Sequence, residues 1–289
     1  MMRILITGGA GSIGSELALR ALSDGHQVTV FDLPSADYSM FEGRDGVKIV
    51  KGDITKEEDV KEAVAGVDAV IHLAALMPHL CTDRQKTMLV NVEGTKNLLK
   101  AAAKTGKDVH FIFSSSVSVY GDTQNEEPPV RCDHPRKALD LYAESKIAAE
   151  DAIMDSGLPY TILRISGVVI PIPMEPPDCW QFMAEQRVEF VNRADVAEAL
   201  YNSLTATGAK NKVFNIAGGP SWQMRGRDYA EKVLEIMELP PDVADYMQTP
   251  GWFDWYDTVE AQQVLNFQKT SFESFCEQLA QAVKEWFGE

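Results

Sequence analysis

A glycine-rich turn between a strand-like run and a helical pattern constrains the fold of this chain more than any other feature. Residues 7–14 read TGGAGSIG; they follow residues 3–6, RILI, and precede a helical pattern over residues 15–23. Because glycine has no side chain, the three spaced glycines let the backbone approach an anion closely. The free N–H groups and the positive dipole end of the following helix then favour a phosphate. The predicted contacts are Gly8, Gly11, Ser12, Ile13 and Gly14.

The next apolar run ends in an acidic residue where dinucleotide sites place one. Residues 27–31 read QVTVF and are followed by Asp32, about twenty residues after the glycines. A carboxylate at this place accepts hydrogen bonds from both hydroxyls of an adenosine ribose. Because Leu33 and Pro34 follow and no cation stands beside Asp32, the site would repel a ribose phosphate. The sequence therefore predicts NAD rather than NADP as the cofactor.

Composition predicts a globular protein with an acidic surface. The chain has 289 residues, 45% of them apolar, which is enough for a nucleotide-binding domain with a smaller domain attached. A net charge of −16 repels phosphate backbones and anionic lipids, so neither nucleic acid nor membrane is expected as a partner. No basic or long apolar segment precedes the first strand, and we expect a cytoplasmic protein. Four scattered cysteines without C-x-x-C spacing predict neither a metal site nor a disulfide framework.

Seven short apolar runs separated by helical patterns predict an α/β protein with a doubly wound parallel sheet, a Rossmann fold. A run such as residues 69–73 is apolar on both faces, as a strand covered by helices on both sides must be. The runs are residues 4–6, 28–31, 48–50, 69–73, 109–113, 160–165 and 213–216. We expect residues 1–166, completed by residues 190–217, to form the NAD-binding domain.

A proline-dense stretch follows the sixth run. Residues 167–177 read GVVIPIPMEPP, and we expect a loop because proline fits neither a helix interior nor a central strand. A strand-and-helix pattern resumes at residues 190–196. The small substrate-binding domain is therefore predicted to be discontinuous, comprising residues 167–189 and 218–289.

Two helical patterns carry stripes of small and apolar residues. They cover residues 87–105 and 142–156, with the spacing of an amphipathic helix. Packing against their own sheet explains both stripes. A four-helix contact in a homodimer is a further expectation.

A tyrosine and a lysine stand four residues apart in the second of these helices. Tyr142 and Lys146 therefore share a face of the helix. A neighbouring ammonium favours phenolate, and a nicotinamide cation would add to this, so we expect the Tyr142 pKa to fall from about 10 toward the working pH. Tyr142 would then act as an acid or base while Lys146 holds the nicotinamide ribose. The serines 114–116 end the fifth run, at the sheet edge where such folds bind ligands.

In this order the motifs resemble those of the extended short-chain dehydrogenase/reductases. The resemblance continues through residues 52–54 (GDI), 72–75 (HLAA), 91–95 (NVEGT) and 113–121 (FSSSVSVYG). It implies that Ser116 is the catalytic hydroxyl, together with Tyr142 and Lys146. The further cofactor contacts that it implies are Asp53, Ile54, Leu73, Ala74, Ala75, Asn91 and Ser114.

Within this family, residues 111–122 are most similar to the UDP-galactose 4-epimerase branch of the NAD-dependent epimerases and dehydratases. The dehydratase branch has an Asp-Glu pair directly after the catalytic hydroxyl, whereas this chain has Val117 and Ser118. Dehydration is therefore disfavoured. The resemblance implies an epimerase or oxidoreductase that transfers hydride between NAD and a hydroxyl-bearing carbon of a sugar or nucleotide sugar.

The predicted substrate side departs from the nucleotide-sugar epimerases, which bind a diphosphate with arginines. Between Ile165 and Asp195 this chain has only two arginines, Arg187 and Arg193. The expected pocket wall is apolar, so an NAD-dependent dehydrogenase of a small, partly apolar alcohol or ketone is the alternative. A non-catalytic nucleotide-binding protein is a third interpretation, which the intact catalytic residues oppose. The substrate candidates are Met77, His79, Val117, Trp180 and Arg225.

Overall fold

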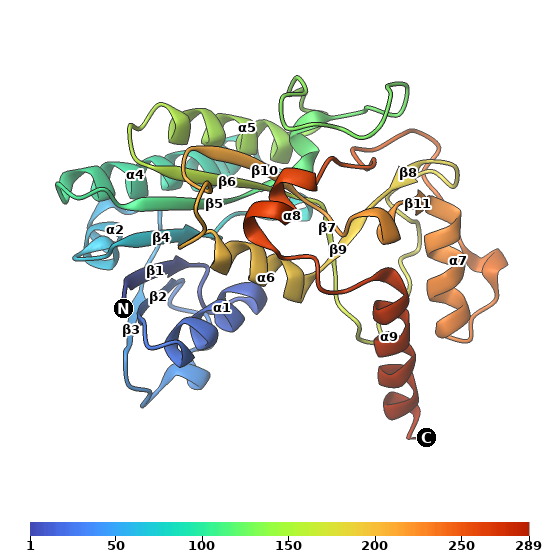
Figure 1. Ribbon diagram of the computed structural model, residues 1–289, viewed down its shortest axis with the longest axis horizontal. Helices are drawn as coiled ribbons and strands as arrows, with labels where there is room; N and C mark the ends of the chain where they lie inside the picture. The colour runs from blue at the N-terminus through green and yellow to red at the C-terminus, as the bar shows by residue number, and fades with distance from the viewer. Residues whose placement is uncertain (289) are drawn as a thin grey trace.

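The structure is a computed structural model that describes residues 1–288, and a parallel sheet of seven strands organises it (Figure 1). The strand order is β10-β6-β5-β4-β1-β2-β3. The strands are β1 (Arg3–Thr7), β2 (Gln27–Asp32), β3 (Val47–Lys51), β4 (Ala69–His72), β5 (His110–Ser116), β6 (Tyr160–Ile165) and β10 (Lys212–Ile216). Every run predicted from the sequence forms one of these strands. The predicted doubly wound Rossmann fold is confirmed.

The strand order reverses beside β1, which pairs with β2 on one side and β4 on the other. Thr7, the last residue of β1, pairs with Phe31 and with His72. Such a reversal opens a crevice at the carboxyl ends of the strands, where open α/β sheets bind their ligands. The glycine-rich turn leaves β1 at this crevice.

Helices cover both faces of the sheet. On one face lie α1 (Ser12–Ser23) and α6 (Arg193–Asn202), and on the other lie α2 (Glu57–Val64), α4 (Gly94–Lys104) and α5 (Leu141–Met154) (Figure 1). Within residues 1–288, none of the helices combines the length and the apolar character needed to cross a lipid bilayer.

The helix predicted over residues 87–105 is divided. It consists of α3 (Arg84–Met88), a π-helical turn (Leu89–Glu93) and α4. In a π-turn the backbone hydrogen bonds span five residues rather than the four of an α-helix, and such turns often lie at functional sites. Here the turn contains the buried Asn91, so the expectation of one continuous helix is wrong at this position.

Alternate residues of the strands build the two halves of the core. Ile4 and Ile6 pack with residues of α1 and α6, whereas Leu5 packs with residues of α2, α4 and α5. All three side chains are fully buried. This alternation follows from the pleat of a strand, which points successive side chains to opposite faces.

A separate aromatic cluster holds together the two segments that were expected to form a small domain. It is built around α7 (Gly226–Ile236), α9 (Phe272–Phe287) and an antiparallel pair, β8 (Arg187–Val188) with β11 (Met224–Arg225). The rings of Phe190 and Tyr229 stack with their centroids 4.2 Å apart. The cluster contains Trp180, Phe182, Phe190, Trp222, Tyr229, Phe253 and Phe275.

The proline-dense stretch is not entirely a loop. Its first three residues form β7 (Gly167–Val169), which pairs in parallel with β9 (Phe190–Asn192). The prediction was wrong there because these residues precede the prolines and their N–H groups are free to pair. One further helix, α8, spans Val259–Leu265, and short 3₁₀ turns lie at Ser39–Phe41, Pro78–Leu80, Val117–Tyr120, Pro220–Trp222 and Pro241–Val243.

Candidate active site

The glycine-rich turn packs so closely against the end of β4 that side chains would not fit. Gly8 has a φ of +67°, and a Cβ built on it would lie 3.0 Å from the backbone nitrogen of Ala74. A Cβ on Gly14 would overlap the carbonyl oxygen of Gly8. No side chain caps α1 at Gly11, and its first turn carries no acidic residue, within the described chain. The turn therefore has the shape and the polarity to hold a diphosphate.

Asp32 lies at the end of β2, beside this turn. Its carboxylate accepts hydrogen bonds from the backbone N–H groups of Ala10, at 3.1 Å, and Leu33, at 2.8 Å. A carboxylate has about four acceptor positions, so two of them stay free for ribose hydroxyls. The position fits the role predicted for Asp32.

A buried pair of side chains, which sequence reasoning missed, supports the turn from below. Thr7 Oγ1 lies 2.7 Å from His72 Nδ1 and accepts hydrogen bonds from the N–H groups of Leu73 and Ala74, both at 3.2 Å. Burial lowers the pKa of His72 to about 3, so the imidazole is neutral. The pair fixes the backbone of Leu73 and Ala74 against Gly8. The HLAA motif was the available signal, because it contains His72.

Asp53 and Ile54 follow β3 at the same edge of the sheet. The Asp53 N–H donates to Asp59 Oδ2, and Asp53 Oδ1 accepts from the Thr55 N–H, both at 2.9 Å. Ile54 packs tightly against Gly94. The half-buried Ala75 belongs to the segment that follows β4. The adenine contact of Asp53 and Ile54, and the cofactor contact of Ala75, stay predictions.

The three predicted catalytic side chains come together where α5 meets the end of β5. Lys146 Nζ donates to the Ser114 carbonyl at 2.7 Å and lies 5.6 Å from the centre of the Tyr142 ring. Ser116 Oγ accepts from the Ser118 N–H at 3.1 Å. The Ser116 hydroxyl also affects Tyr142, because a hydrogen bond between the two side chains lowers the pKa of the phenol. Hydroxyl, phenol and ammonium thus share one corner of the crevice.

Burial decides the protonation of these groups. It raises the pKa of Tyr142 well above its ordinary value, and the nearby Cys81 and Asp140 add to the rise. It lowers the pKa of Lys146 to about 8, against the opposing effect of Glu150. Lys146 by itself therefore does not produce the expected fall of the Tyr142 pKa, because burial of the phenol raises that pKa. The further effect expected from a nicotinamide cation stays a prediction.

A buried carboxylate one turn beyond Lys146 anchors α5, and sequence reasoning missed it. Glu150 is fully buried and accepts from Ser115 Oγ at 2.6 Å. It also pairs with Arg164, at 3.0 and 2.7 Å, and with Arg136 at 3.1 Å. These bonds tie the catalytic helix to β5 and β6. The spacing of four residues between Lys146 and Glu150 was the available signal.

Asn91 joins the loop after β4 to α5. Its Nδ2 donates to the Leu76 carbonyl at 3.2 Å and to Ser145 Oγ at 2.9 Å, and its Oδ1 accepts from the Leu76 N–H at 2.7 Å. Both amide hydrogens are therefore used within the protein. These bonds make Asn91 a residue that positions this loop, and its predicted contact with the cofactor stays a prediction. The exposed Met77 and His79 lie on the same loop.

A largely apolar cavity of about 410 Å³ lies between the glycine-rich turn, the proline-dense stretch and α7 and α9. Of the predicted substrate residues, Trp180 lines it. Val117 is fully buried and packs with Tyr120 and Tyr256, so the expectation that it faces substrate is wrong. Its place in the sequence, directly after Ser116, did not reveal that its side chain points into the core.

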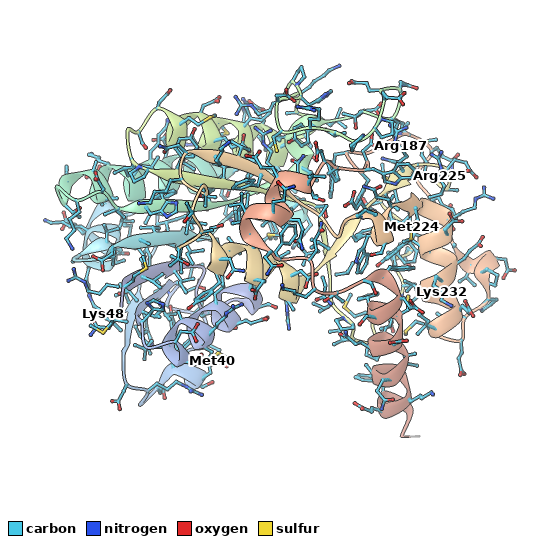
Figure 2. The ribbon with its side chains drawn as sticks, in the orientation of Figure 1. Met40, Lys48, Arg187, Met224, Arg225 and Lys232 are labelled. Carbon is cyan, nitrogen blue, oxygen red and sulfur yellow. The ribbon has the colours of Figure 1, made fainter. Side chains whose placement is uncertain are left out.

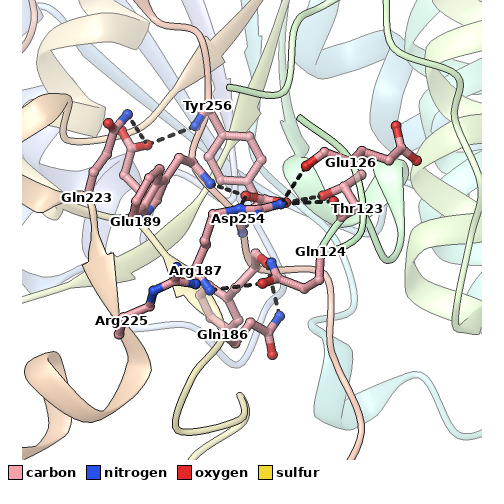
Figure 3. Close-up of polar contacts among 12 residues, drawn as sticks. Thr123, Gln124, Glu126, Gln186, Arg187, Glu189, Gln223, Arg225, Asp254 and Tyr256 are labelled. Atoms are coloured by element: carbon pink, nitrogen blue, oxygen red, sulfur yellow. Dashed lines mark hydrogen bonds and ion pairs between the residues drawn. The ribbon is translucent and has the colours of Figure 1, made fainter. Parts of the chain in front are cut away.

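The arginines of the small domain are engaged by the protein itself. Arg187 and Arg225 are partners across the β8–β11 pair and lie close together in Figure 2. Arg187 pairs with the buried Asp254, with one contact of 2.9 Å (Figure 3). Arg225 donates to the Glu185 carbonyl at 2.9 Å, and Arg227 pairs with the Glu185 carboxylate. Arg225 does not line the cavity beside the glycine-rich turn, and its contact with substrate stays a prediction.

Known proteins resemble this chain in sequence and in fold. The 3-beta-hydroxysteroid dehydrogenase of Mycolicibacterium neoaurum is 35% identical over 178 residues, 57% of this chain and 47% of that protein, so the chain spans about half the length of this curated relative. The dTDP-D-glucose 4,6-dehydratase of Mus musculus is 28% identical over 283 residues, 88% of this chain and 77% of that protein. The Bordetella bronchiseptica enzyme WbmH, crystallised in complex with NAD+, is 26% identical; the alignment covers 100% of this chain and 99% of that chain, with a TM-score of 0.80.

A family model gives the most direct assignment. The model of the NAD dependent epimerase/dehydratase family matches residues 4–177, from β1 to the end of the proline-dense stretch. This match includes the glycine-rich turn, Asp32 and the Ser116, Tyr142 and Lys146 corner. Since it covers more than half of the chain, the protein belongs to the NAD-dependent epimerase/dehydratase family.

Proposed function

We propose that this chain binds NAD and catalyses hydride transfer at a hydroxyl-bearing carbon of a sugar or nucleotide sugar. The observation that carries the proposal is the meeting of Ser116, Tyr142 and Lys146 at the crevice that the glycine-rich turn borders. The crystallised complex of WbmH with NAD+ supports the choice of cofactor. The similarity to a dTDP-D-glucose 4,6-dehydratase supports the choice of substrate class.

The cofactor would lie along the carboxyl edge of the sheet. Gly8, Gly11, Ser12, Ile13 and Gly14 would hold its diphosphate, Asp32 its adenosine ribose, and Lys146 its nicotinamide ribose. Ser114 would contribute through the carbonyl that orients Lys146. When bound, NAD supplies the hydride acceptor and, once reduced, the hydride donor.

Tyr142 moves the proton of the reacting hydroxyl. Because burial favours its neutral phenol, Tyr142 is set to donate a proton to a carbonyl oxygen of the substrate. In the reverse direction the phenolate, left when the phenol has given up its proton, accepts the proton of the substrate hydroxyl, and the positive charge of Lys146 favours this ionised form. Ser116 Oγ, held by the Ser118 N–H, orients the substrate oxygen.

A test of the proposal separates epimerase from dehydrogenase. Purified protein is denatured and its released nucleotide is identified, and turnover of UDP-galactose is followed together with the absorbance of reduced nicotinamide. An epimerase retains NAD and converts the sugar without net reduction, whereas a dehydrogenase accumulates NADH. Tyr142→Phe is the control. If neither wild type nor Tyr142→Phe turns over substrate although both bind NAD, the non-catalytic interpretation replaces the enzyme.

A second candidate function is an NAD-dependent dehydrogenase of a small, partly apolar alcohol or ketone. Its support is the engagement of Arg187, Arg225 and Arg227 by the protein, which leaves them less available for a sugar diphosphate. The 3-beta-hydroxysteroid dehydrogenase similarity points the same way. An assay of NAD reduction would distinguish the two candidate functions. It compares secondary alcohols with an increasing number of rings against UDP-galactose as hydride donors. Reduction of NAD by the alcohols alone favours this candidate.

We also infer that residues 167–189 and 218–289 act as the substrate-binding domain and that the enzyme is a cytoplasmic homodimer. The dimer contact would use the surface of α3, the π-turn and α5, where Leu89 is 47% exposed. Light scattering after gel filtration tests the dimer. A Leu89→Glu variant should shift the equilibrium from dimer toward monomer. If this variant has the same particle mass as wild type, the dimer contact lies elsewhere.

A further inference from the structure

A guanidinium from a segment that is distant in the sequence reaches the start of α1. Arg193 is the first residue of α6, and its Nη1 donates to Ser12 Oγ at 2.7 Å, across 181 residues of sequence. Its Nε lies 3.4 Å from Glu16 Oε2. Ser12 in turn is the first residue of α1, directly after the glycine-rich turn. Arg193 therefore lies beside the N–H groups that would face a diphosphate.

The space beside this contact is open. Ser12, Ile13 and Arg193 all line the cavity of about 410 Å³. Among the lining residues that belong to the described part of the chain, Arg193 is the only cation and Glu175 the only acid. The positive charge of Arg193 thus adds to the positive end of α1 at one end of an otherwise apolar cavity.

We propose that Arg193 binds the diphosphate of the dinucleotide, an inference that rests on the proposed function because it assumes NAD in the crevice. Its guanidinium would exchange the Glu16 carboxylate for a phosphate oxygen. The Glu16 contact is long, and the two side chains are 38% and 39% exposed, so this ion pair holds the guanidinium weakly. A phosphate that also receives the N–H groups of α1 offers Arg193 a stronger, two-pronged hydrogen bond.

A purely structural role is the competing explanation, because α1 and α6 lie side by side (Figure 1). The chain offers a matched control for it. Arg20 of α1 pairs with Glu198 of α6 and is 37% exposed, close to the exposure of Arg193, yet it does not line the cavity. Loss of either arginine removes one ion pair between the same two helices. Only loss of Arg193 removes charge from the proposed diphosphate site.

Calorimetric titration of wild type, Arg193→Gln and Arg20→Gln with NAD, ADP-ribose and adenosine tests the proposal. Arg193→Gln should weaken the binding of NAD and of ADP-ribose equally, by about tenfold or more, because both ligands carry the diphosphate. Adenosine, which lacks it, should bind the variant and wild type alike. Arg20→Gln should bind all three as wild type does. Added salt should weaken NAD binding more in wild type than in Arg193→Gln.

Each other result has a defined meaning. Equal NAD affinity of Arg193→Gln and wild type overturns the proposal, as does an equal loss in Arg20→Gln, which would assign the effect to the packing of α1 on α6. A wild-type protein that binds adenosine but not NAD overturns the proposed function and this inference with it. If Arg193→Gln does not fold, Arg193→Lys takes its place. The lysine keeps the positive charge but lacks the planar guanidinium, so NAD binding should weaken by a smaller factor than in Arg193→Gln.

Discussion

Lys146 donates a hydrogen bond to the backbone carbonyl of Ser114 at 2.7 Å, which joins helix α5 to the end of β5. The ammonium is nearly fully buried, and Glu150, the carboxylate that opposes the lowering of its pKa, is shared with two arginines. The site therefore contains a cation whose proton is held less firmly than in water. The pH dependence of the enzyme should follow from it.

Activity should fall as the pH rises above about 8. The Lys146 pKa is lowered to about 8, so the ammonium that is proposed to hold the nicotinamide ribose loses its proton there. The unfolded chain keeps this proton up to an ordinary lysine pKa of about 10.4, so between these values the contribution of Lys146 to stability rises with pH. The expected loss of activity is therefore not caused by unfolding.

Measurement of kcat/KM across this pH range, with a thermal melt at each pH, tests the prediction. A kcat/KM of wild type that does not change with pH would contradict it. Lys146→Arg, which stays charged, should be slower but should lose the decline.

Removal of the phenolic hydroxyl should abolish proton transfer and leave the fold intact. Tyr142→Phe keeps the ring and loses the acid, so kcat should fall by about 10²-fold or more. NAD affinity and the melting temperature should stay near those of wild type. Steady-state kinetics and calorimetry give both quantities. A variant that loses NAD binding as strongly as kcat would assign Tyr142 to cofactor binding instead.

Glu150→Gln should destabilise the protein, because it leaves the buried Arg164 guanidinium without its carboxylate, whereas Arg136 keeps its ion pair with Asp151. Loss of one partner of a buried ion pair costs about 3–5 kcal/mol. Arg136 is partly exposed, which places the expected loss near the lower end. Denaturant unfolding measures it. The control is Glu58→Gln, whose carboxylate is exposed beside Lys61 and should change the free energy of unfolding little. Equal effects of the two variants would contradict the role of Glu150.

Glu189 should make the protein less stable as the pH rises from about 4 to about 8. It is fully buried and accepts from the N–H groups of Gly219 and Tyr256 and from Gln223 Nε2 (Figure 3). Burial outweighs these bonds and raises its pKa to about 8. The folded state therefore binds more protons than the unfolded state across this window, so the free energy of unfolding falls as pH rises.

The difference between wild type and Glu189→Gln isolates this effect. Melting temperatures of the two proteins are compared at several pH values across the window. The wild type should lose stability relative to the variant as the pH increases. Parallel curves would mean that Glu189 keeps an ordinary pKa.

The elements of the fold could be predicted from local patterns of residues. Glycine spacing, runs that are apolar on both faces and the four-residue step from Tyr142 to Lys146 report backbone geometry that neighbours in the chain impose. The seven strands, the glycine-rich turn and the catalytic corner were therefore accessible to sequence reasoning. The π-turn around Asn91 was not, because it depends on the bonds of Asn91 to Leu76 and Ser145.

The properties of the site depended on contacts between distant segments. Burial set the protonation of Tyr142 and Lys146. The side chain of Val117 packs in the core rather than facing the crevice. Asp254 pairs with Arg187, and the Glu185 carbonyl accepts a hydrogen bond from Arg225. Sequence by itself determined which chemical groups this protein has and the order of its strands and helices, because those follow from short-range geometry. Only the tertiary structure decided which charges are buried, which are neutralised and which, like Arg193, reach the crevice, because electrostatic energies depend on solvent exposure and on partners brought together by folding.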